Sequence, residues 1–346
     1  MRIGSIAVRI PSRKITNEDM LAEIAKLNPD SSPKQLNRYL RGLGFILDRC
    51  GSNTRFLRDR ESGESAHALI HEACTEALAS AGIAAEDIGL LIYCGVGRGF
   101  LEPASAYFVA RSLGLSCECF DVLDACMSWV RALHIAYQFL AAGLHRHILV
   151  VNGEFNMYEH GYPELLRGIC RERLRYTFPA FTIGEAATAT VVSASEEIWR
   201  FRFRSQPEHV ALCTIPLAAH ADFSGIDADL ALNGVGQFVS FGQKLSCAGL
   251  EGIVNFIKQE YPNRDAIRWW FPHAASREMC RLAEQRLGLQ GRVFNDVFPR
   301  YGNLVSASIP AALNIALSDG RLRRGQRVVL CPVSAGMSQA LVEFTF

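Results

Sequence analysis

Three residues of this 346-residue chain, a cysteine, a histidine and an asparagine, lie where apolar segments begin or end. Side chains of these three types can together catalyse reactions of thioesters. Cys126 follows a strand-like apolar run and precedes a long apolar segment that is expected to be a helix. His273 ends the strand-like run that starts at Ile267, and Asn303 lies just before another apolar helical segment. One nucleophile and two hydrogen-bonding groups at the mouths of buried elements suit a cysteine acyl-transfer site.

Each of the three residues also has an ordinary structural interpretation. A buried cysteine usually fills a core, and a lone histidine is often a hydrogen-bonded structural residue. An asparagine that follows glycine usually belongs to a turn. The catalytic interpretation gains weight because an internal repeat places all three at equivalent strand or helix ends, where residues of two halves can converge.

Composition limits the classes of protein to consider. Hydrophobic residues make up 49% of the chain, enough for a large core in one or two domains. The net charge of +1 gives no indication of nucleic-acid binding. The 11 cysteines are an odd number without paired spacing, which predicts a reduced, cytoplasmic protein. No secretory segment is expected at the N-terminus, and no apolar run approaches the roughly 18 residues of a membrane span.

The order of apolar segments predicts an α/β architecture built by duplication. Strands are expected at residues 90–94 and 147–151, and helices at residues 65–82 and 127–142. Ala132-Leu-His-Ile-Ala136 recurs as Ala312-Leu-Asn-Ile-Ala316, an offset of 312 − 132 = 180 residues. We therefore predict two similar halves, residues 1–196 with the nucleophile and residues 197–346 with the histidine and asparagine.

Several motifs resemble those of the ketoacyl synthase III-like condensing enzymes of the thiolase superfamily. The resemblance extends over nearly the whole chain. It rests on Asp124-Ala-Cys126, Thr182-Ile-Gly184, Pro272-His273, and Gly302-Asn303 followed by Ser306-Ala-Ser-Ile-Pro310. It implies a thiolase fold, layered α-β-α-β-α and made of two duplicated halves, and a homodimer. It also implies no metal and no cofactor, with coenzyme A or acyl-carrier-protein thioesters as substrates.

Carried over residue by residue, the resemblance makes Cys126 the nucleophile that forms an acyl-enzyme. Its place at a helix N-terminus is expected to favour the thiolate. An oxyanion hole is expected from the Cys126 N–H and an N–H of the loop that contains Ser334 and Gly336. His273 and Asn303 are expected to donate hydrogen bonds to a second thioester, whose enolate attacks the acyl-enzyme in a Claisen condensation.

Two other functions remain open at this point. The acyl group could pass to an alcohol or an amine, which gives an ester or amide without a new carbon–carbon bond. The chain could instead be a non-catalytic partner subunit that only shapes the tunnel of a heterodimer. The presence of Cys126, His273 and Asn303 together argues against the partner-subunit interpretation, because a scaffold needs none of them.

The segment Gly99-Phe-Leu-Glu-Pro103 resembles one in the head-to-head condensing enzymes of bacterial olefin biosynthesis. There a glutamate reaches across the dimer and acts as a base. The likeness implies that Glu102 enters the partner's site and removes a proton next to a thioester carbonyl. The ordinary alternative is a loop carboxylate that satisfies N–H groups of a helix beginning at Pro103.

A further pair of residues is expected to bind the donor. Arg49 matches a family arginine that holds the adenine of coenzyme A, while Phe45 stands where a tryptophan is frequent. Phenylalanine stacks on a base more weakly than tryptophan does. This difference favours a carrier protein over coenzyme A as the donor.

Overall fold

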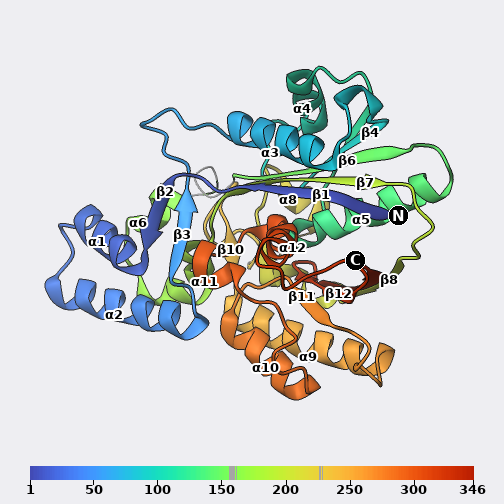
Figure 1. Cartoon of the computed structure of the whole chain (residues 1–346). Coiled ribbons are helices and arrows are strands. Elements are labelled where there is room, and N and C mark those ends of the chain that lie inside the picture. Colours follow the sequence, from blue (N-terminus) through green and yellow to red (C-terminus); the bar gives the residue numbers. More distant parts are fainter. Residues whose placement is uncertain (156–159, 161, 226, 228) are drawn as a thin grey trace.

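In the computed structural model of the chain, which describes residues 1–155, 160, 162–225, 227 and 229–346, two β-sheets alternate with three layers of helices (Figure 1). The first sheet has the strand order β1-β7-β6-β4-β5. Its strands are β1 (Arg2–Arg9), β4 (Leu90–Cys94), β5 (Glu118–Val122), β6 (His147–Glu154) and β7 (Ala186–Ser193). The second sheet is formed by β8 (Arg200–Ser205), β11 (Trp269–Pro272), β12 (Arg327–Cys331), β13 (Val333–Ser334) and β14 (Ser338–Thr345).

The two sheets share one pairing pattern. In the first, β6 pairs parallel with β4 and antiparallel with β7, which pairs antiparallel with β1. In the second, β12 pairs parallel with β11 and antiparallel with β14, which pairs antiparallel with β8. The strand topology therefore contains the expected duplication. The predicted division at residues 196 and 197 falls between β7 and β8 and stays a prediction.

The central layer consists of α5 (Ser128–Ala141) and α12 (Ser308–Ser318), which lie between the two sheets. These are the two helices that carry the five-residue repeat. Both are apolar over most of their surface because sheets cover them on two sides. Within β4, Leu90 and Ile92 face this central core, whereas Leu91 and Tyr93 face the opposite side. Because successive side chains of a strand point to opposite faces, each strand contributes both to the core around the central helices and to the core under the outer helices.

The outer layers complete the α-β-α-β-α order that the sequence predicts. The helices α3 (Ala66–Ala81) and α4 (Ser105–Leu113) cover the first sheet, and α9 (Gly242–Glu260) and α10 (Arg277–Leu287) cover the second (Figure 1). The side chain of Ser65 caps the start of α3, and Gly82 ends it in a left-handed conformation, close to the predicted bounds.

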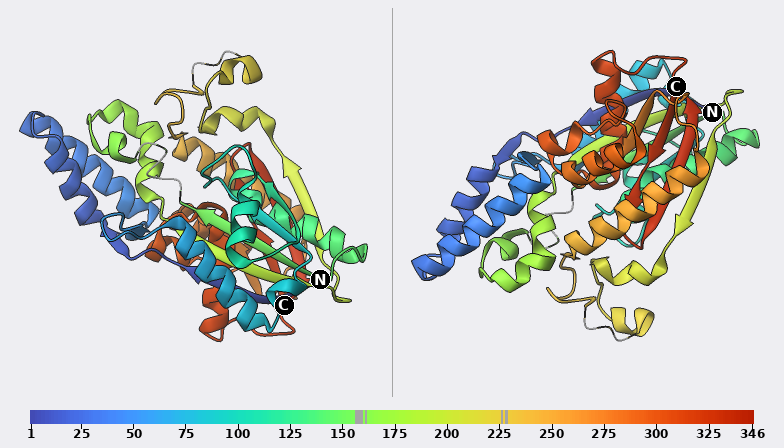
Figure 2. Two further views of the ribbon diagram at one scale, coloured as in Figure 1. Left: turned by 90° about the horizontal axis from the view of Figure 1, so that it is seen from above. Right: turned by 90° about the horizontal axis from the view of Figure 1, so that it is seen from below.

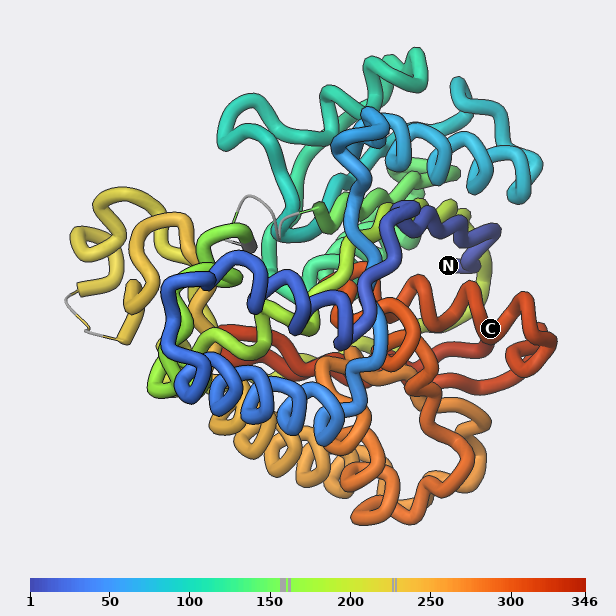
Figure 3. Tube along the Cα trace, turned by 90° about the vertical axis from the view of Figure 1, so that its left-hand side faces the viewer, coloured from blue at the N-terminus to red at the C-terminus, as the bar shows by residue number. Residues whose placement is uncertain are grey.

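A pair of helices, α1 (Asn17–Leu27) and α2 (Pro33–Cys50), projects from the layered body (Figure 2). A two-stranded ribbon of β2 (Arg13–Thr16) and β3 (Thr54–Leu57) links this pair to the rest of the chain. The two helices pack on the segment from Leu165 to Ile183, and their core includes Cys126. The N- and C-termini lie near each other at the opposite side of the molecule (Figure 3).

The remaining elements are short. They are β9 (Cys213–Thr214), β10 (Val239–Ser240), α6 (Tyr162–Leu166), α7 (Leu174–Thr177), α8 (His220–Ser224), α11 (Val297–Tyr301) and the 3₁₀ turns η1 (Ala85–Asp87), η2 (Ala125–Met127), η3 (Arg171–Arg173), η4 (Phe178–Thr182), η5 (Pro207–Leu212) and η6 (Val305–Ala307). Among the described residues, no helix has the length and apolar character that crossing a bilayer requires.

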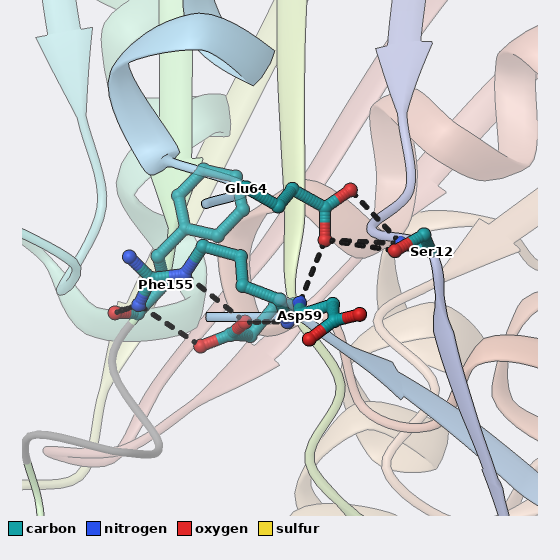
Figure 4. Close-up of polar contacts among 6 residues, drawn as sticks. Ser12, Asp59, Glu64 and Phe155 are labelled. Atoms are coloured by element: carbon teal, nitrogen blue, oxygen red, sulfur yellow. Dashed lines mark hydrogen bonds and ion pairs between the residues drawn. The ribbon is translucent and has the colours of Figure 1, made fainter. Parts of the chain in front are cut away.

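A polar cluster fixes the segment after β3 to the first sheet (Figure 4). The Nε of Arg58 lies 3.2 Å from Oε2 of Glu185, and both side chains are almost fully buried. Glu64 accepts hydrogen bonds from the backbone N–H groups of Ser12 at 3.0 Å and of Asp59 at 2.8 Å. Because a buried charge is costly without a partner, these contacts hold the ribbon and the helical pair in one position.

Candidate active site

Cys126 lies in η2, a tight turn between β5 and α5. The preceding residue, Ala125, has a φ of +44°, which is unusual for a residue other than glycine. The turn is closed by a 2.9 Å hydrogen bond from the N–H of Met127 to the carbonyl of Asp124. Ser128 Oγ donates to the carbonyl of Ala125 at 2.7 Å and accepts from the N–H of Asp124 at 2.8 Å. These bonds stabilise the strained backbone that presents the thiol.

The second half of the chain also supports this turn. Ser334, in β13, accepts a hydrogen bond from the N–H of Met127 at 3.2 Å and donates one to the carbonyl of Asp124 at 3.3 Å. The sequence predicts Ser334 and Gly336 as substrate-binding residues. In the structure Ser334 lines the cavity described below and its hydroxyl holds the nucleophile turn, whereas Gly336 is not among the residues that line the cavity.

Cys126, His273 and Asn303 line one cavity of about 1070 Å³. They reach it from separate elements: Cys126 from η2, His273 from the end of β11, and Asn303 from the link between α11 and η6. The structure therefore places the three predicted residues on the lining of the same cavity. The cavity also takes in Cys213 of β9, a thiol that the sequence analysis did not single out. Their catalytic roles stay predictions.

His273 is held in its neutral form by burial. Burial lowers the pKa of His273 from its ordinary value of 6.5 to about 4. Its Nδ1 is buried and has no hydrogen-bond partner among the described residues. A neutral imidazole has one N–H donor and one acceptor nitrogen, so His273 can both accept a proton and donate a hydrogen bond.

Asn303 is fixed by the motif Thr182-Ile-Gly184. Its N–H donates to the carbonyl of Thr182 at 2.8 Å, and its carbonyl accepts from the N–H of Gly184 at 3.1 Å. The backbones approach so closely that a Cβ on Gly184 would lie 2.1 Å from the carbonyl oxygen of Tyr301. Asn303 Oδ1 accepts from the N–H of Val305 at 2.9 Å, which leaves the amide NH₂ as the group that can donate into the cavity.

The expectation that Cys126 favours the thiolate is wrong for the single chain. Burial raises the pKa of the Cys126 thiol well above its ordinary value, and the neighbouring Cys213 and Glu154 raise it further. The thiol is therefore protonated at neutral pH, and its proton must be removed as substrate reacts.

Phe45 and Arg49 lie on one face of α2, and both line the same cavity. Phe45 is 64% exposed and Arg49 is exposed, so they mark the mouth of the cavity. Arg175 and Lys244, also exposed, line it as well. A mouth with three cations and a free aromatic ring suits an anionic group that carries a base or a phosphate.

Glu102 lies outside the cavity of its own chain. Its side chain is exposed and it is not among the lining residues. The alternative that it satisfies helix N–H groups is wrong, because α4 begins at Ser105 rather than at Pro103. The first N–H groups of α4, those of Ser105 and Ala106, instead donate to the carboxylate of Asp121 at 2.8 and 2.9 Å. A position across a dimer stays a prediction.

Comparison with known proteins gives one consistent family. The family model described as 3-oxoacyl-[acyl-carrier-protein] synthase III matches residues 120–159, and the model of its C-terminal part matches residues 257–344. A β-ketoacyl-[acyl-carrier-protein] synthase III of Serratia proteamaculans is 30% identical over 306 residues, which cover 87% of this chain and 90% of that protein. The corresponding protein of Salmonella arizonae is 29% identical over the same length.

Among solved structures, OleA of Xanthomonas campestris is similar over nearly the whole chain. A form with one cysteine replaced by serine, bound to lauric acid and lauroyl-CoA, gives a TM-score of 0.82 at 25% identity and covers 99% of this chain and 98% of that one. A cerulenin-bound form gives a TM-score of 0.81 at 25% identity and covers 99% of this chain and 96% of that one. Other similar OleA structures carry substitutions of one glutamate or one histidine.

The depressed pKa of His273 predicts a pH dependence of stability. Between the ordinary pKa of 6.5 and the folded value of about 4, the unfolded chain binds a proton that the folded chain does not. Stability should therefore fall as the pH drops through this interval, by on the order of 2–3 kcal/mol. Urea unfolding across this pH range should show a smaller loss for His273→Asn than for the unmodified chain.

A matched control for this measurement is His67→Asn, because His67 is exposed on α3. This variant should follow the unmodified chain. An equally steep loss of stability in His273→Asn and in the unmodified chain would contradict the prediction.

Proposed function

Because the chain belongs to the 3-oxoacyl-[acyl-carrier-protein] synthase III family of condensing acyltransferases, we propose that it forms an acyl-enzyme on Cys126 and transfers that acyl group to a second acyl thioester. Enzymes of this family use thioester substrates and require no cofactor. The observation that carries the proposal is the single cavity that Cys126, His273 and Asn303 line together.

In the first step, Cys126 Sγ attacks the acyl carbonyl, and the carrier thiol leaves. The neutral imidazole of His273 accepts the proton of Cys126 and can return it to the leaving thiolate. The N–H of Cys126 and an N–H of the loop from Val333 to Ala335 stabilise the oxyanion. The loop is suited to this role because it lines the cavity and binds the nucleophile turn through Ser334.

In the second step, the carbonyl of the other thioester takes hydrogen bonds from His273 and the amide of Asn303. These bonds stabilise the enolate that forms when the acceptor loses CO₂ or a proton. The enolate carbon attacks the acyl-enzyme, a carbon–carbon bond forms, and Cys126 leaves as thiolate and is reprotonated. The product is a 3-oxoacyl thioester.

We further propose long-chain acyl groups as substrates. The cavity continues from Cys126 into the core between the second sheet and α9 and α10, where Leu250, Trp270 and Leu287 line it. Protein interiors contain few voids larger than a water molecule. An apolar cavity of this size is therefore a binding space, and its apolar lining supports a hydrocarbon chain as the occupant. The complex of OleA with lauroyl-CoA supports the same class of substrate, a long-chain acyl thioester.

A homodimer is proposed from the edge of the first sheet. The strand β5 forms one edge of that sheet. Two apolar side chains are exposed in nearby segments of the chain: Leu123, directly after β5, by 60%, and Leu101, in the loop between β4 and α4, by 77%. An exposed strand edge with apolar neighbours is suited to pairing with a second copy. Glu102 lies next to Leu101 and would face the partner there, which supports its role as a base in the partner's cavity.

A cytoplasmic location is also proposed. Every one of the 11 cysteines is a free thiol. Thiols that remain reduced in this number suit a reducing compartment.

The nucleophile can be tested by intact-protein mass spectrometry after incubation with coenzyme A and carrier-protein donors of several chain lengths. We expect the unmodified chain to gain the mass of the acyl group and Cys126→Ala to gain none. Cys213→Ser is the matched control, because it removes the neighbouring thiol of the same cavity and should still be acylated.

An adduct that persists in Cys126→Ala would refute the acyl-enzyme. No adduct on the unmodified chain with any donor would favour the partner-subunit function. Adding thioester, alcohol or amine acceptors to the acylated protein separates condensation from simple acyl transfer.

The length of the acyl chain is tested at α10. Ala283 lines the cavity, and Ala283→Phe should fill part of the space that a chain would occupy. We expect acylation by a long-chain donor to fall about tenfold or more, with acetyl transfer changed by less than about twofold. Gln285→Phe adds the same ring on the exposed side of α10 and should leave both rates unchanged. Equal losses for long and short donors would argue against the chain-binding role.

The role of Glu102 is tested by Glu102→Gln. We expect acylation to be retained. Condensation with an acceptor that cannot lose CO₂ should fall by roughly 100-fold, because only this step needs a base to remove a proton from the carbon next to the thioester carbonyl. Glu86→Gln, a surface change on the same half, serves as control. Unchanged product formation would remove Glu102 from the mechanism.

A further inference from the structure

A buried carboxylate, Glu154, connects the end of β6 to the turn that follows Asn303. Its side chain is 0% exposed. Oε1 accepts from the hydroxyl of Ser306 and, at 3.3 Å, from the N–H groups of Ser306 and Val96. Oε2 accepts from the N–H of Gly97 at 3.1 Å. Glu154 therefore ties η6 to the loop after β4, and both segments contribute lining residues to the cavity.

The internal repeat relates the turn that Glu154 binds to the turn that carries Cys126. The offset of 180 residues relates Cys126 to Ser306, since 306 − 126 = 180. Val305 has a φ of +51°, as Ala125 has one of +44°, so the two turns share one strained geometry. Ala307 N–H donates to the carbonyl of Leu304 at 2.9 Å, the counterpart of the bond from Met127 to Asp124. In the second half, a serine thus occupies the position of the nucleophile.

The supporting residues are related by the same offset. Glu154 corresponds to Ser334, since 334 − 154 = 180. Ser334 accepts from the turn of Cys126, and Glu154 accepts from the turn of Ser306. Each turn is thus held by a residue at the end of a strand of the opposite half, Glu154 of β6 or Ser334 of β13. A serine supports the nucleophile turn, and a carboxylate supports the turn next to Asn303.

We propose that Glu154 is a positioning residue of the condensation site, which fixes Asn303 through Ser306 and places a negative charge near the turn of Cys126. This inference rests on the function proposed above. The group acts through its neighbours, since it is not among the residues that line the cavity.

The direction of the hydrogen bonds supports an ionised carboxylate. Thr188 Oγ1 donates to Asn152 Oδ1 at 2.8 Å, and Asn152 Nδ2 donates to Ser306 Oγ at 2.8 Å. Ser306 Oγ is therefore left to donate its own proton to Glu154. Burial raises the pKa of Glu154, and the hydrogen bonds from Ser306, Gly97 and Val96 oppose that rise. At least three N–H groups and one hydroxyl of the described residues converge on the carboxylate, which suits its charged form.

The turn η6, which Glu154 binds through Ser306, contacts the turn η2 of Cys126, so the charge of Glu154 lies near that thiol. Burial is the largest cause of the raised pKa of that thiol, and Glu154 adds to it. Glu154 thus has two separable effects: its hydrogen bonds hold a turn, and its charge disfavours the Cys126 thiolate. A purely structural residue would show only the first.

The test compares Glu154→Gln, Glu154→Asp and Ser306→Ala in the full chain. The pH dependence of Cys126 alkylation by iodoacetamide is read by peptide mass spectrometry, and the kcat and KM of condensation are measured separately. We expect Glu154→Gln to move the alkylation midpoint to lower pH by about 0.5–1 unit. Glu154→Asp keeps the charge and should stay near the unmodified midpoint.

We expect Ser306→Ala to keep the alkylation midpoint or raise it, because the charge remains with one donor fewer. In both Glu154→Gln and Ser306→Ala, the kcat of condensation should fall about tenfold or more, with KM within about twofold. Glu185→Gln is the matched control, because it neutralises another buried carboxylate, the partner of Arg58. It should lower stability without moving the midpoint.

Two results would overturn the proposal. One is that the pH midpoint of Cys126 alkylation in Glu154→Gln equals that of the unmodified chain. The other is that the kcat of condensation is unchanged in both Glu154→Gln and Ser306→Ala. The two proposals can fail separately. The absence of an acyl-enzyme would refute the proposed function, whereas the alkylation midpoint still reports on Glu154 because alkylation needs no substrate.

Discussion

Two strained turns determine how this site is built. The central helices α5 and α12 each begin after a non-glycine residue with positive φ, at Ala125 and at Val305. Such a conformation costs on the order of 1–3 kcal/mol and persists only where surrounding contacts fix it. Here those contacts come from both sheets, through Ser334 for one turn and Glu154 for the other. The layered fold is therefore the means by which the thiol and the amide are held at one cavity.

Burial sets the chemistry of the site as much as geometry does. The same dry surroundings that lower the pKa of His273 raise that of Cys126, because both changes favour the uncharged form. A resting site with a neutral thiol and a neutral imidazole differs from a preformed thiolate–imidazolium pair. Charge develops only when substrate reacts, and in a low-dielectric cavity the oriented N–H groups stabilise that charge strongly.

Much of this structure could be predicted from the sequence, for identifiable reasons. The repeat of Ala132–Ala136 at Ala312–Ala316 predicts the paired central helices, because residues packed between two sheets are apolar on most sides. The motifs around Cys126, His273 and Asn303 predict a shared site, and in the structure all three residues line one cavity, while their roles stay predictions. The contribution of α2 to the cavity mouth follows from Phe45 and Arg49, which lie four residues apart and so share a helix face.

The protonation of Cys126 could not be predicted in the same way. Position before a helix is visible in the sequence, but the amount of water lost around a thiol depends on the packing of segments far apart in the chain. The support of α4 by Asp121 is hidden for a related reason, since the pairing of β5 with β4 places that carboxylate beside the helix. Glu154 reads in the sequence as one more residue at a strand end. The offset of 180 residues that relates it to Ser334 was the signal that could have revealed it.

The duplication explains why the two halves are no longer alike at these positions. Where the first half carries a thiol on its turn, the second carries Ser306, whose hydroxyl is directed to Glu154 and is buried from the cavity. A second nucleophile at that position would compete for acyl groups, whereas a hydroxyl bound to a carboxylate is engaged in structure. The free polar group of the second half is then Asn303, three residues before Ser306, which suits hydrogen bonding to a carbonyl rather than attack on it. A symmetric scaffold thereby supplies two different functions from two turns of the same geometry, and each turn depends on the opposite half for its support.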